Sequence, residues 1–227
     1  MRWKEFEDEA VRYEGWYVTS KGQRVDRAER ALLTWLLTSI PSAASLLEIG
    51  CGTGHFTRWL RDMPLQVIGL DRSPAMLKEF RRRSPDLPAV LADAHALPLG
   101  DAGRDLVVYV TALEFPEEST LALTEAVRVA RQGVLLVVLN RWSAGGISRR
   151  WGAQRRQPLL GRAHDYSLGD LRKMLTEVAG ARLREVRWRS SLFPGLPWCW
   201  QLPVPLGDIL GCAALLSAPE SDRSDAC

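Results

Sequence analysis

The chain has 227 residues, of which 46% are hydrophobic and 25% charged, and its formal net charge is +3. This length suits one α/β domain with a modest elaboration, and the composition is that of a soluble globular protein. The small positive charge does not by itself indicate a nucleic-acid-binding protein. Because no apolar run approaches the roughly 20 residues of a membrane span, and the start has no apolar signal core, we expect a cytoplasmic protein without a membrane span.

The apolar pattern of the first 140 residues predicts alternating helices and strands. Helices are expected over residues 24–39, 54–62, 74–83 and 117–131, and strands over residues 45–49, 65–70, 89–91, 106–110 and 134–139. Ser73 and Pro74 supply an N-cap and a first-turn proline for the third helix. This alternation predicts a parallel sheet that is covered by helices on both faces.

The pattern changes beyond Asn140. Ser167 and Asp170 resemble a capping box that opens a helix ending near residue 179. Residues 182–189 and 209–217 suit a closing pair of strands. A loop rich in proline and tryptophan, residues 192–205, separates them.

The segment Glu48–Gly54 places three glycines at a turn between a strand and a helix. Glycines let a ligand approach the backbone, and the following helix directs free N–H groups at it. The spacing is G-x-G-x-G, so the final glycine of a dinucleotide fingerprint would fall on His55 or Thr57. A pyrophosphate would not favour Glu48 nearby, whereas a cationic cofactor would. A nicotinamide enzyme is therefore the least favoured interpretation.

Several segments in order carry a family resemblance: LLEIGCGTGHFTRWL, GLDRSPAML, LADAHALPL, VTALEFPEE and VLLVVLNRWS. They resemble the class I S-adenosylmethionine-dependent methyltransferases, particularly the small family similar to ubiquinone/menaquinone biosynthesis methylases (methyltransferase type 11). The resemblance implies a Rossmann-like α/β fold, with a seven-stranded, mostly parallel sheet, helices on both faces and a closing antiparallel strand. We expect one domain over residues 1–227: a helical lid (1–40), a cofactor-binding core (41–140), a substrate-cover insertion (141–205), the closing strand (206–218) and a frayed tail (219–227).

The resemblance also implies which residues contact S-adenosylmethionine. They are Tyr13, Trp16, Glu48, Gly50, Cys51, Gly52, Gly54, Asp71, Arg72, Met76, Asp93, Ala94, Thr111 and Leu113. In this family the acidic residue matching Asp71 accepts both ribose hydroxyls, and the one matching Asp93 accepts from the adenine amino group. Tyr13 and Trp16 are expected to fold over the methyl donor, although packing on the first helix is an equal alternative.

Methyl transfer needs orientation and desolvation more than it needs a base. Glu114, just after the fourth strand, is the nearest candidate base, and a role as a charge partner of a helix N-terminus is at least as plausible. His55 is interpreted as structural. The isolated His95 and His164 and four scattered cysteines predict no metal site.

The acceptor is expected to be a small molecule that is covered by residues 141–205. Alternatives are a methyltransferase-like binding or regulatory module without turnover and an RNA methyltransferase. The RNA alternative depends on a basic stretch for which a solvated arginine-rich helix or loop is the favoured explanation; it comprises Arg149, Arg150, Arg155, Arg156 and Arg162. Trp188, Trp198 and Trp200 could line an apolar pocket, contact a membrane surface or belong to the core. A monomer or a homodimer is expected.

Overall fold

The computed structural model describes residue 7 and residues 9–150, 163–197 and 199–218. The strands of its sheet are β1 (Ser45–Ile49), β2 (Gln66–Asp71), β3 (Ala89–Leu91), β4 (Arg104–Val110), β5 (Ala130–Leu139), β6 (Leu183–Ser191) and β7 (Ile209–Leu216). The helices are α2 (Ser20–Leu37), α3 (His55–Arg61), α4 (Pro74–Arg83), α5 (Ser119–Val129), α6 (Ala144–Arg150) and α7 (Leu168–Ala179), with short 3-10 turns η1 (Tyr13–Trp16) and η3 (Gly180–Arg182).

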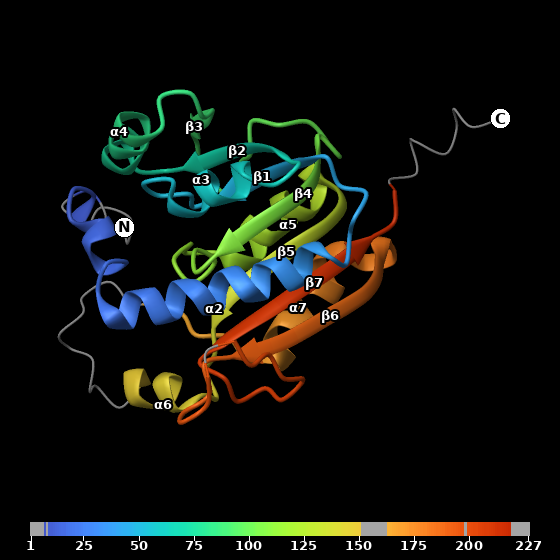
Figure 1. Ribbon diagram of the computed structural model, residues 1–227. Helices are drawn as coiled ribbons and strands as arrows, with labels where there is room; N and C mark the ends of the chain where they lie inside the picture. The colour runs from blue at the N-terminus through green and yellow to red at the C-terminus, as the bar shows by residue number, and fades with distance from the viewer. Residues whose placement is uncertain (1–6, 8, 151–162, 198, 219–227) are drawn as a thin grey trace.

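The seven strands form one sheet in the order β3-β2-β1-β4-β5-β7-β6 (Figure 1). Strands β1 to β5 pair in parallel, whereas β7 runs antiparallel to both β5 and β6. The expected seven-stranded, mostly parallel sheet with a closing antiparallel strand is confirmed. Because β7 is reversed, the segment before it returns to the same edge of the sheet at which β5 ends.

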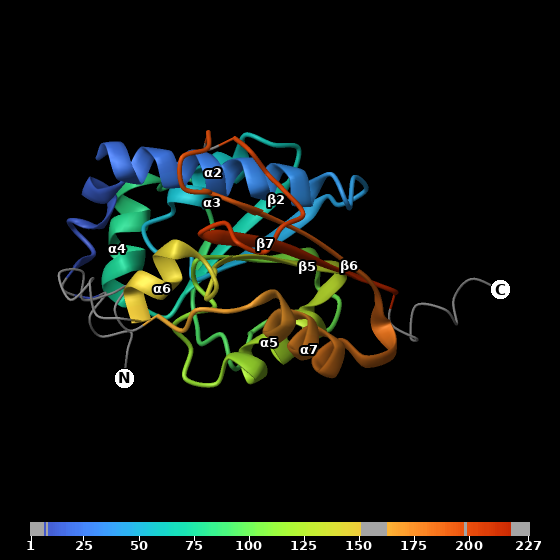
Figure 2. The same ribbon diagram turned by 90° about the horizontal axis from the view of Figure 1, so that it is seen from below.

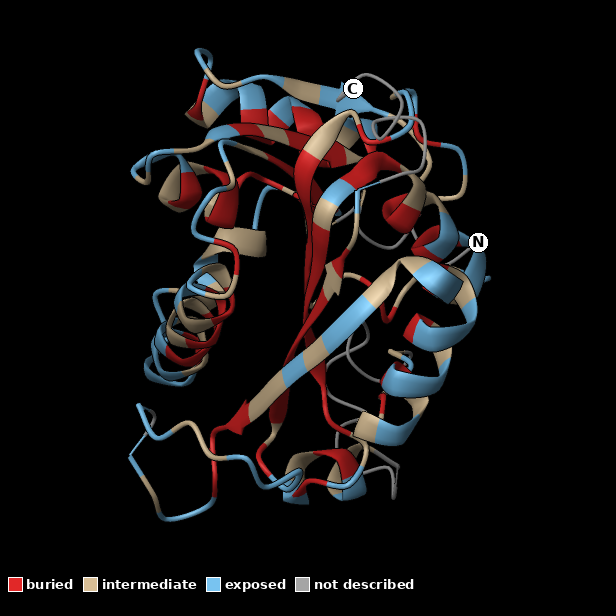
Figure 3. Cartoon of the chain, turned by 90° about the vertical axis from the view of Figure 1, so that its right-hand side faces the viewer, coloured by how far each residue is buried: buried red, intermediate tan, exposed pale blue. Residues whose placement is uncertain are grey.

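Helices cover both faces of the sheet, as Figure 2 shows with α2 and α3 above it and α5 and α7 below. Leu33 and Leu36 of α2 pack with Phe56 and Leu60 of α3 on one face. The other face packs on α5 and α7. The inner strands are buried along nearly their whole length, whereas the helices expose their outward sides (Figure 3). The residues of the inner strands are therefore covered by helices on both faces, which explains the continuous apolar runs of β4 and β5.

The element boundaries differ from those expected where polar residues interrupt the apolar pattern. Strand β4 begins at Arg104 because Asp105 is held inside it: its carboxylate accepts the N–H groups of Ala44 and Ser45, both at 3.0 Å. Helix α2 begins earlier than expected, at Ser20, since the Thr19 side chain caps it. The capping box of α7 is present as expected, whereas α6 lies in a segment for which no helix was predicted.

Candidate functional site

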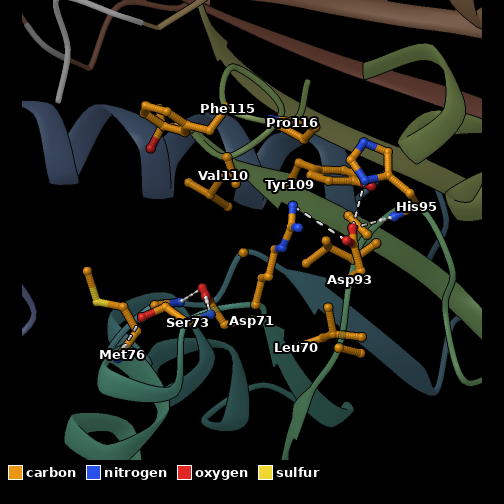
Figure 4. A pocket seen from close by; sticks show the side chains of 18 of the residues that line it. Leu70, Asp71, Ser73, Met76, Asp93, His95, Tyr109, Val110, Phe115 and Pro116 are labelled. Atoms are coloured by element: carbon orange, nitrogen blue, oxygen red, sulfur yellow. Dashed lines mark hydrogen bonds and ion pairs between the residues drawn. The ribbon is translucent and has the colours of Figure 1, made fainter. Parts of the chain in front are cut away.

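A cavity lies at the carboxyl ends of β1, β2 and β4 (Figure 4). About 900 Å³ in this region is not filled by protein atoms, and this volume includes the solvent at the open mouth of the cavity. Nine of the residues that we expected at a cofactor site line it: Tyr13, Gly50, Gly52, Asp71, Arg72, Met76, Asp93, Ala94 and Thr111. Ligands of open α/β sheets bind at this edge, where strand order reverses; here β1 lies between β2 and β4.

The glycine turn after β1 needs its glycines for two different physical reasons. Gly50, Gly52 and Gly54 all have a positive φ, between +53° and +83°, which disfavours other residues. A Cβ on Gly50 would lie 2.5 Å from the Cβ of Ala112, and one on Gly54 would lie 2.5 Å from the Phe80 ring. A Cβ on Gly52 would approach nothing closer than 3.9 Å. Gly50 and Gly54 thus permit close packing, whereas Gly52 faces the open cavity.

Asp71 ends β2 and is fixed by the backbone around it. One carboxylate oxygen accepts the Gly52 N–H and the other accepts the Ser73 N–H, both at 2.8 Å. Burial raises the pKa of Asp71, although the backbone hydrogen bonds oppose the shift. Because a carboxylate has about four acceptor positions, Asp71 keeps the capacity to accept a pair of hydroxyl groups in the cavity.

Asp93, which follows β3, is held by His95 and Arg72. The His95 Nδ1 lies 2.7 Å from one oxygen, which also accepts the His95 N–H, and Arg72 Nη1 lies 3.4 Å from the other. Desolvation acts to raise the pKa of Asp93, but the His95 bonds and the Arg72 charge outweigh it and lower the pKa. The side chain is about one-third exposed, at 36%, so Asp93 is an ionised acceptor at the open side of the cavity.

The opposite wall consists mostly of residues that were not expected at the site; Thr111 is the exception. Phe115 and Pro116 lie across the cavity from Asp71 and Met76 in Figure 4. The unassigned lining residues are Ile49, Leu70, Ser73, Ala92, His95, Tyr109, Val110, Ala112, Phe115, Pro116 and Glu117. Most of them end or follow a strand, so proximity to predicted strand ends was the signal that would have found them. Within this wall Thr111 has a φ of +45°, a strained backbone typical of functional sites.

The segment around η1 is fastened beside the glycine turn. Glu14 accepts from the Thr53 hydroxyl at 2.9 Å and from Arg58 at 2.6 Å, and its second oxygen accepts from Arg83 at 3.1 Å. Tyr17 stacks on His55 with ring centroids 3.7 Å apart. This attachment holds Tyr13 against the cavity, where burial raises the pKa of its hydroxyl to about 12.

Five expected contact residues do not line the cavity: Trp16, Glu48, Cys51, Gly54 and Leu113. Glu48 is 2% exposed and accepts the Thr57 hydroxyl at 2.5 Å, and burial raises its pKa to about 8. It therefore joins β1 to α3 rather than presenting a negative charge to a ligand, which removes the electrostatic reason for expecting it at the site. Trp16 packs edge-on to Tyr17 instead of entering the cavity.

Glu29 and Glu114 are two buried carboxyls that the structure leaves inside the protein. Their residues are 2% and 0% exposed, and the Thr111 side chain hydrogen-bonds to Glu29. Burial raises the pKa of both carboxyls to about 8, and the charge of Glu114 adds to the shift of Glu29. Glu114 Oε1 accepts the Leu139 N–H at 2.7 Å, while Oε2 has no hydrogen-bond partner among the described residues. Glu114 does not line the cavity.

The basic stretch is described only in part. Arg149 is partly buried and forms an ion pair with Asp165 at 3.0 Å, their side chains being 10% and 13% exposed, so its charge is paired within the protein. Residues Arg155, Arg156 and Arg162, like Trp198, lie outside the described residues. The described part of the chain contains no cluster of three or more potential metal ligands. None of its helices has the length and hydropathy that crossing a bilayer requires.

Comparison with known proteins identifies a methyltransferase domain (Methyltransf_11) over residues 47–138. A demethylmenaquinone methyltransferase of Renibacterium salmoninarum is 36% identical over 134 residues, which cover 59% of this chain and 55% of the relative. A malonyl-[acyl-carrier protein] O-methyltransferase of Serratia marcescens is 31% identical over 137 residues, covering 60% and 52%. The chain thus spans about half the length of these curated relatives.

Solved structures share the fold over nearly the whole chain. A SAM-dependent methyltransferase of Thermotoga maritima, described as a possible histamine N-methyltransferase, superposes with a TM-score of 0.75 at 22% identity, covering 95% of this chain and 99% of that one. The architecture is therefore the Rossmann-like fold expected from the sequence.

Proposed function

We propose that the chain binds S-adenosylmethionine and transfers its methyl group to a small-molecule acceptor, because residues 47–138 match a methyltransferase domain. The observation that carries the proposal is the pair of acidic side chains, Asp71 and Asp93, on one cavity beside a left-handed glycine turn. The relatives share the domain, but their methyl acceptors do not identify the acceptor of this chain.

The cavity residues fit the chemistry of the proposed cofactor. Asp71 has acceptor capacity left for the two ribose hydroxyls, and the ionised Asp93 suits a donor such as an exocyclic amino group. Met76 and Tyr13 provide apolar surface on either side of the open position at Gly52. Glu48 does not line the cavity, and its side chain accepts the Thr57 hydroxyl inside the protein.

The bound cofactor would supply an electrophilic methyl group on a sulfonium. The chain's own residues would orient that group and exclude water, and both effects accelerate an in-line displacement. Tyr13, held over the cavity by the contacts of Glu14, and Phe115 on the opposite wall suit the exclusion of water. We assign no catalytic base: Glu114 does not line the cavity, and its raised pKa leaves it mostly protonated near neutral pH.

Isothermal titration calorimetry with S-adenosylmethionine and S-adenosylhomocysteine tests the proposal. Each good hydrogen bond to a charged group contributes about 1.5–3 kcal/mol, so Asp71→Ala is expected to weaken binding at least about a hundredfold. Asp62→Ala is the matched control, since the Asp62 side chain is 75% exposed on another part of the surface. Absence of binding to either ligand by the intact protein would refute the proposal.

A turnover assay separates an enzyme from a binding module with the same fold. Labelled S-adenosylmethionine would be incubated with a pool of cell metabolites, and label would be followed into small molecules and into RNA. Incorporation into a small molecule supports the proposal. Incorporation into RNA alone would favour the nucleic-acid alternative, for which the partly buried Arg149–Asp165 pair offers no support. Cofactor binding without any transfer would favour a regulatory module.

A further inference from the structure

Exposed apolar side chains concentrate in two segments on one side of the molecule. We call five of them the apolar rim: Trp142, Ile147, Trp200, Val204 and Leu206, which are 40–54% exposed. They are half of the ten large apolar side chains that the described part of the chain leaves exposed. Single exposed apolar residues are ordinary, whereas a cluster of this kind marks an interaction surface.

The two segments of the apolar rim are tied together by hydrogen bonds. Asn140, directly after β5, donates from its side chain to the carbonyls of Pro205 at 3.1 Å and Gly207 at 2.8 Å. Near the start of α6, the Gly145 N–H donates to Asp208 at 2.9 Å. Both segments lie along the lower side of the molecule in Figure 1, which is turned toward the viewer in Figure 2. They therefore form a common surface rather than two unrelated loops.

A row of cations flanks the apolar rim. Lys21, Arg24 and Arg27 are exposed and follow one another at a spacing of three residues near the start of α2, so they lie on one side of that helix. Arg24 donates to the carbonyl of Leu196, in the same loop as Trp200, at 3.1 Å. On the same helix, the carboxylate of Asp26 is engaged by Arg30 and His55. The border of the rim is thus positively charged.

We propose that the apolar rim and its cationic border dock onto the surface of an anionic lipid bilayer. Tryptophan is favoured at the boundary between headgroups and acyl chains, and each Lys or Arg near an anionic surface strengthens binding. Insertion of the apolar side chains into the bilayer buries apolar surface, which adds to the electrostatic attraction. A second copy of the chain is a poorer occupant, because a two-fold interface here would bring the same three cations close to their own copies.

Vesicle co-sedimentation tests the docking directly and needs neither cofactor nor activity. The probes are vesicles of phosphatidylcholine alone and of phosphatidylcholine with an equal amount of phosphatidylglycerol. The full chain is expected to bind the anionic vesicles at least tenfold more tightly and to lose most of that binding in 0.5 M salt. The triple variant Trp142→Ala/Ile147→Ser/Leu206→Ser is expected to bind at least tenfold more weakly, and Lys21→Gln/Arg24→Gln several-fold more weakly.

The matched control is Leu121→Ser on α5, whose side chain is 44% exposed and outside the rim; it is expected to bind like the parent. Circular dichroism and thermal midpoints, which should change little because all these side chains are exposed, distinguish lost docking from lost folding. Equal sedimentation of the parent and the triple variant, or no binding to anionic vesicles, would overturn the proposal. So would a parent dimer that the triple variant converts to monomers without any vesicle binding, since the rim would then be a subunit interface.

Discussion

The carboxyl edge of the sheet is built in two different ways on either side of β4. At β1, β2 and β3, polar side chains are fixed by the backbone of the turn that follows each strand, as Asp71 is by Gly52 and Ser73. At β5 and β7, the edge is extended by α6 and by the loop between β6 and β7, joined through the side chain of Asn140. The first half forms a partly open cavity in which Asp71 and Asp93 lie among apolar side chains, whereas the second half presents apolar side chains outward. Ligand recognition and contact with the surroundings are thus separated along one edge.

The largest effect on the half of the edge at β1, β2 and β3 is expected from Gly50→Ala. The new Cβ would lie 2.5 Å from the Ala112 Cβ at a φ of +73°, so close packing and backbone strain act together. We expect the free energy of unfolding to fall by about 2–4 kcal/mol, measured by urea denaturation. Gly100→Ala is the control, because nothing lies within 4 Å of its added methyl group. Equal stability of the two variants would show that the turn is not tightly constrained.

The two buried carboxyls Glu29 and Glu114 predict that the stability of the protein depends on pH. Burial raises the pKa of Glu29 and Glu114 to about 8, above the value near 4.3 of an unfolded chain. Between these values the folded state binds more protons, so stability falls as pH rises toward 8. Glu114→Gln removes one such group. We expect the loss in unfolding free energy between pH 6 and pH 8 to be smaller by about 1–2 kcal/mol in the variant; an unchanged loss would contradict a raised pKa.

The attachment of the η1 segment can be weakened without touching the cavity wall. Glu14→Gln keeps the shape of the side chain but removes the charge that pairs with Arg58 and Arg83. Since these pairs are partly buried, we expect a loss of about 1 kcal/mol in unfolding free energy and faster release of S-adenosylhomocysteine in stopped-flow fluorescence. The exposed pair of Arg187 and Glu185 is the comparison, and Glu185→Gln should change neither quantity.

The smallest expected effect is at the open side of the cavity. Asp93 is partly exposed and remains ionised, so solvent screens its interactions more than those of Asp71. We expect Asp93→Asn to weaken cofactor binding by about three- to fivefold in calorimetry. A loss as large as that of Asp71→Ala would show that both carboxylates are equally enclosed when ligand is bound.

The sequence was most informative where the backbone itself makes the site. Apolar periodicity and turn residues predicted every strand of the sheet, and the family motifs led to Asp71, Asp93 and the glycine turn. Phe115 and His95 also follow strand ends, but the family motifs gave them no role at the site, so they were missed. A motif does not say which way a side chain points: Glu48 is buried and accepts the Thr57 hydroxyl, so its contact with the cofactor stays a prediction.

The half of the edge at β5 and β7 was harder to predict, because the segments that contact one another there lie far apart in the sequence. Asn140 meets Pro205 and Gly207 across more than 60 residues, and neither segment has a periodic apolar pattern that predicts this contact. Helix α6 was also missed, because its sequence Ala144–Arg150 contains two glycines, which are poor helix formers.

Because β6 and β7 pair in antiparallel fashion, the loop between them can be replaced by another loop. Ser191 and Ile209 are direct partners in the register, so the loop leaves and re-enters the sheet at a single point. The entropy of closing such a loop changes only slowly with its length. Ser190 of β6 exchanges backbone hydrogen bonds with Leu202 of the loop, both at 3.0 Å, so a replacement loop has to keep this bridge. Grafting loops of different length and polarity between Ser191 and Ile209 would therefore redesign the outward-facing half of the edge while leaving the cavity at β1, β2 and β4 intact.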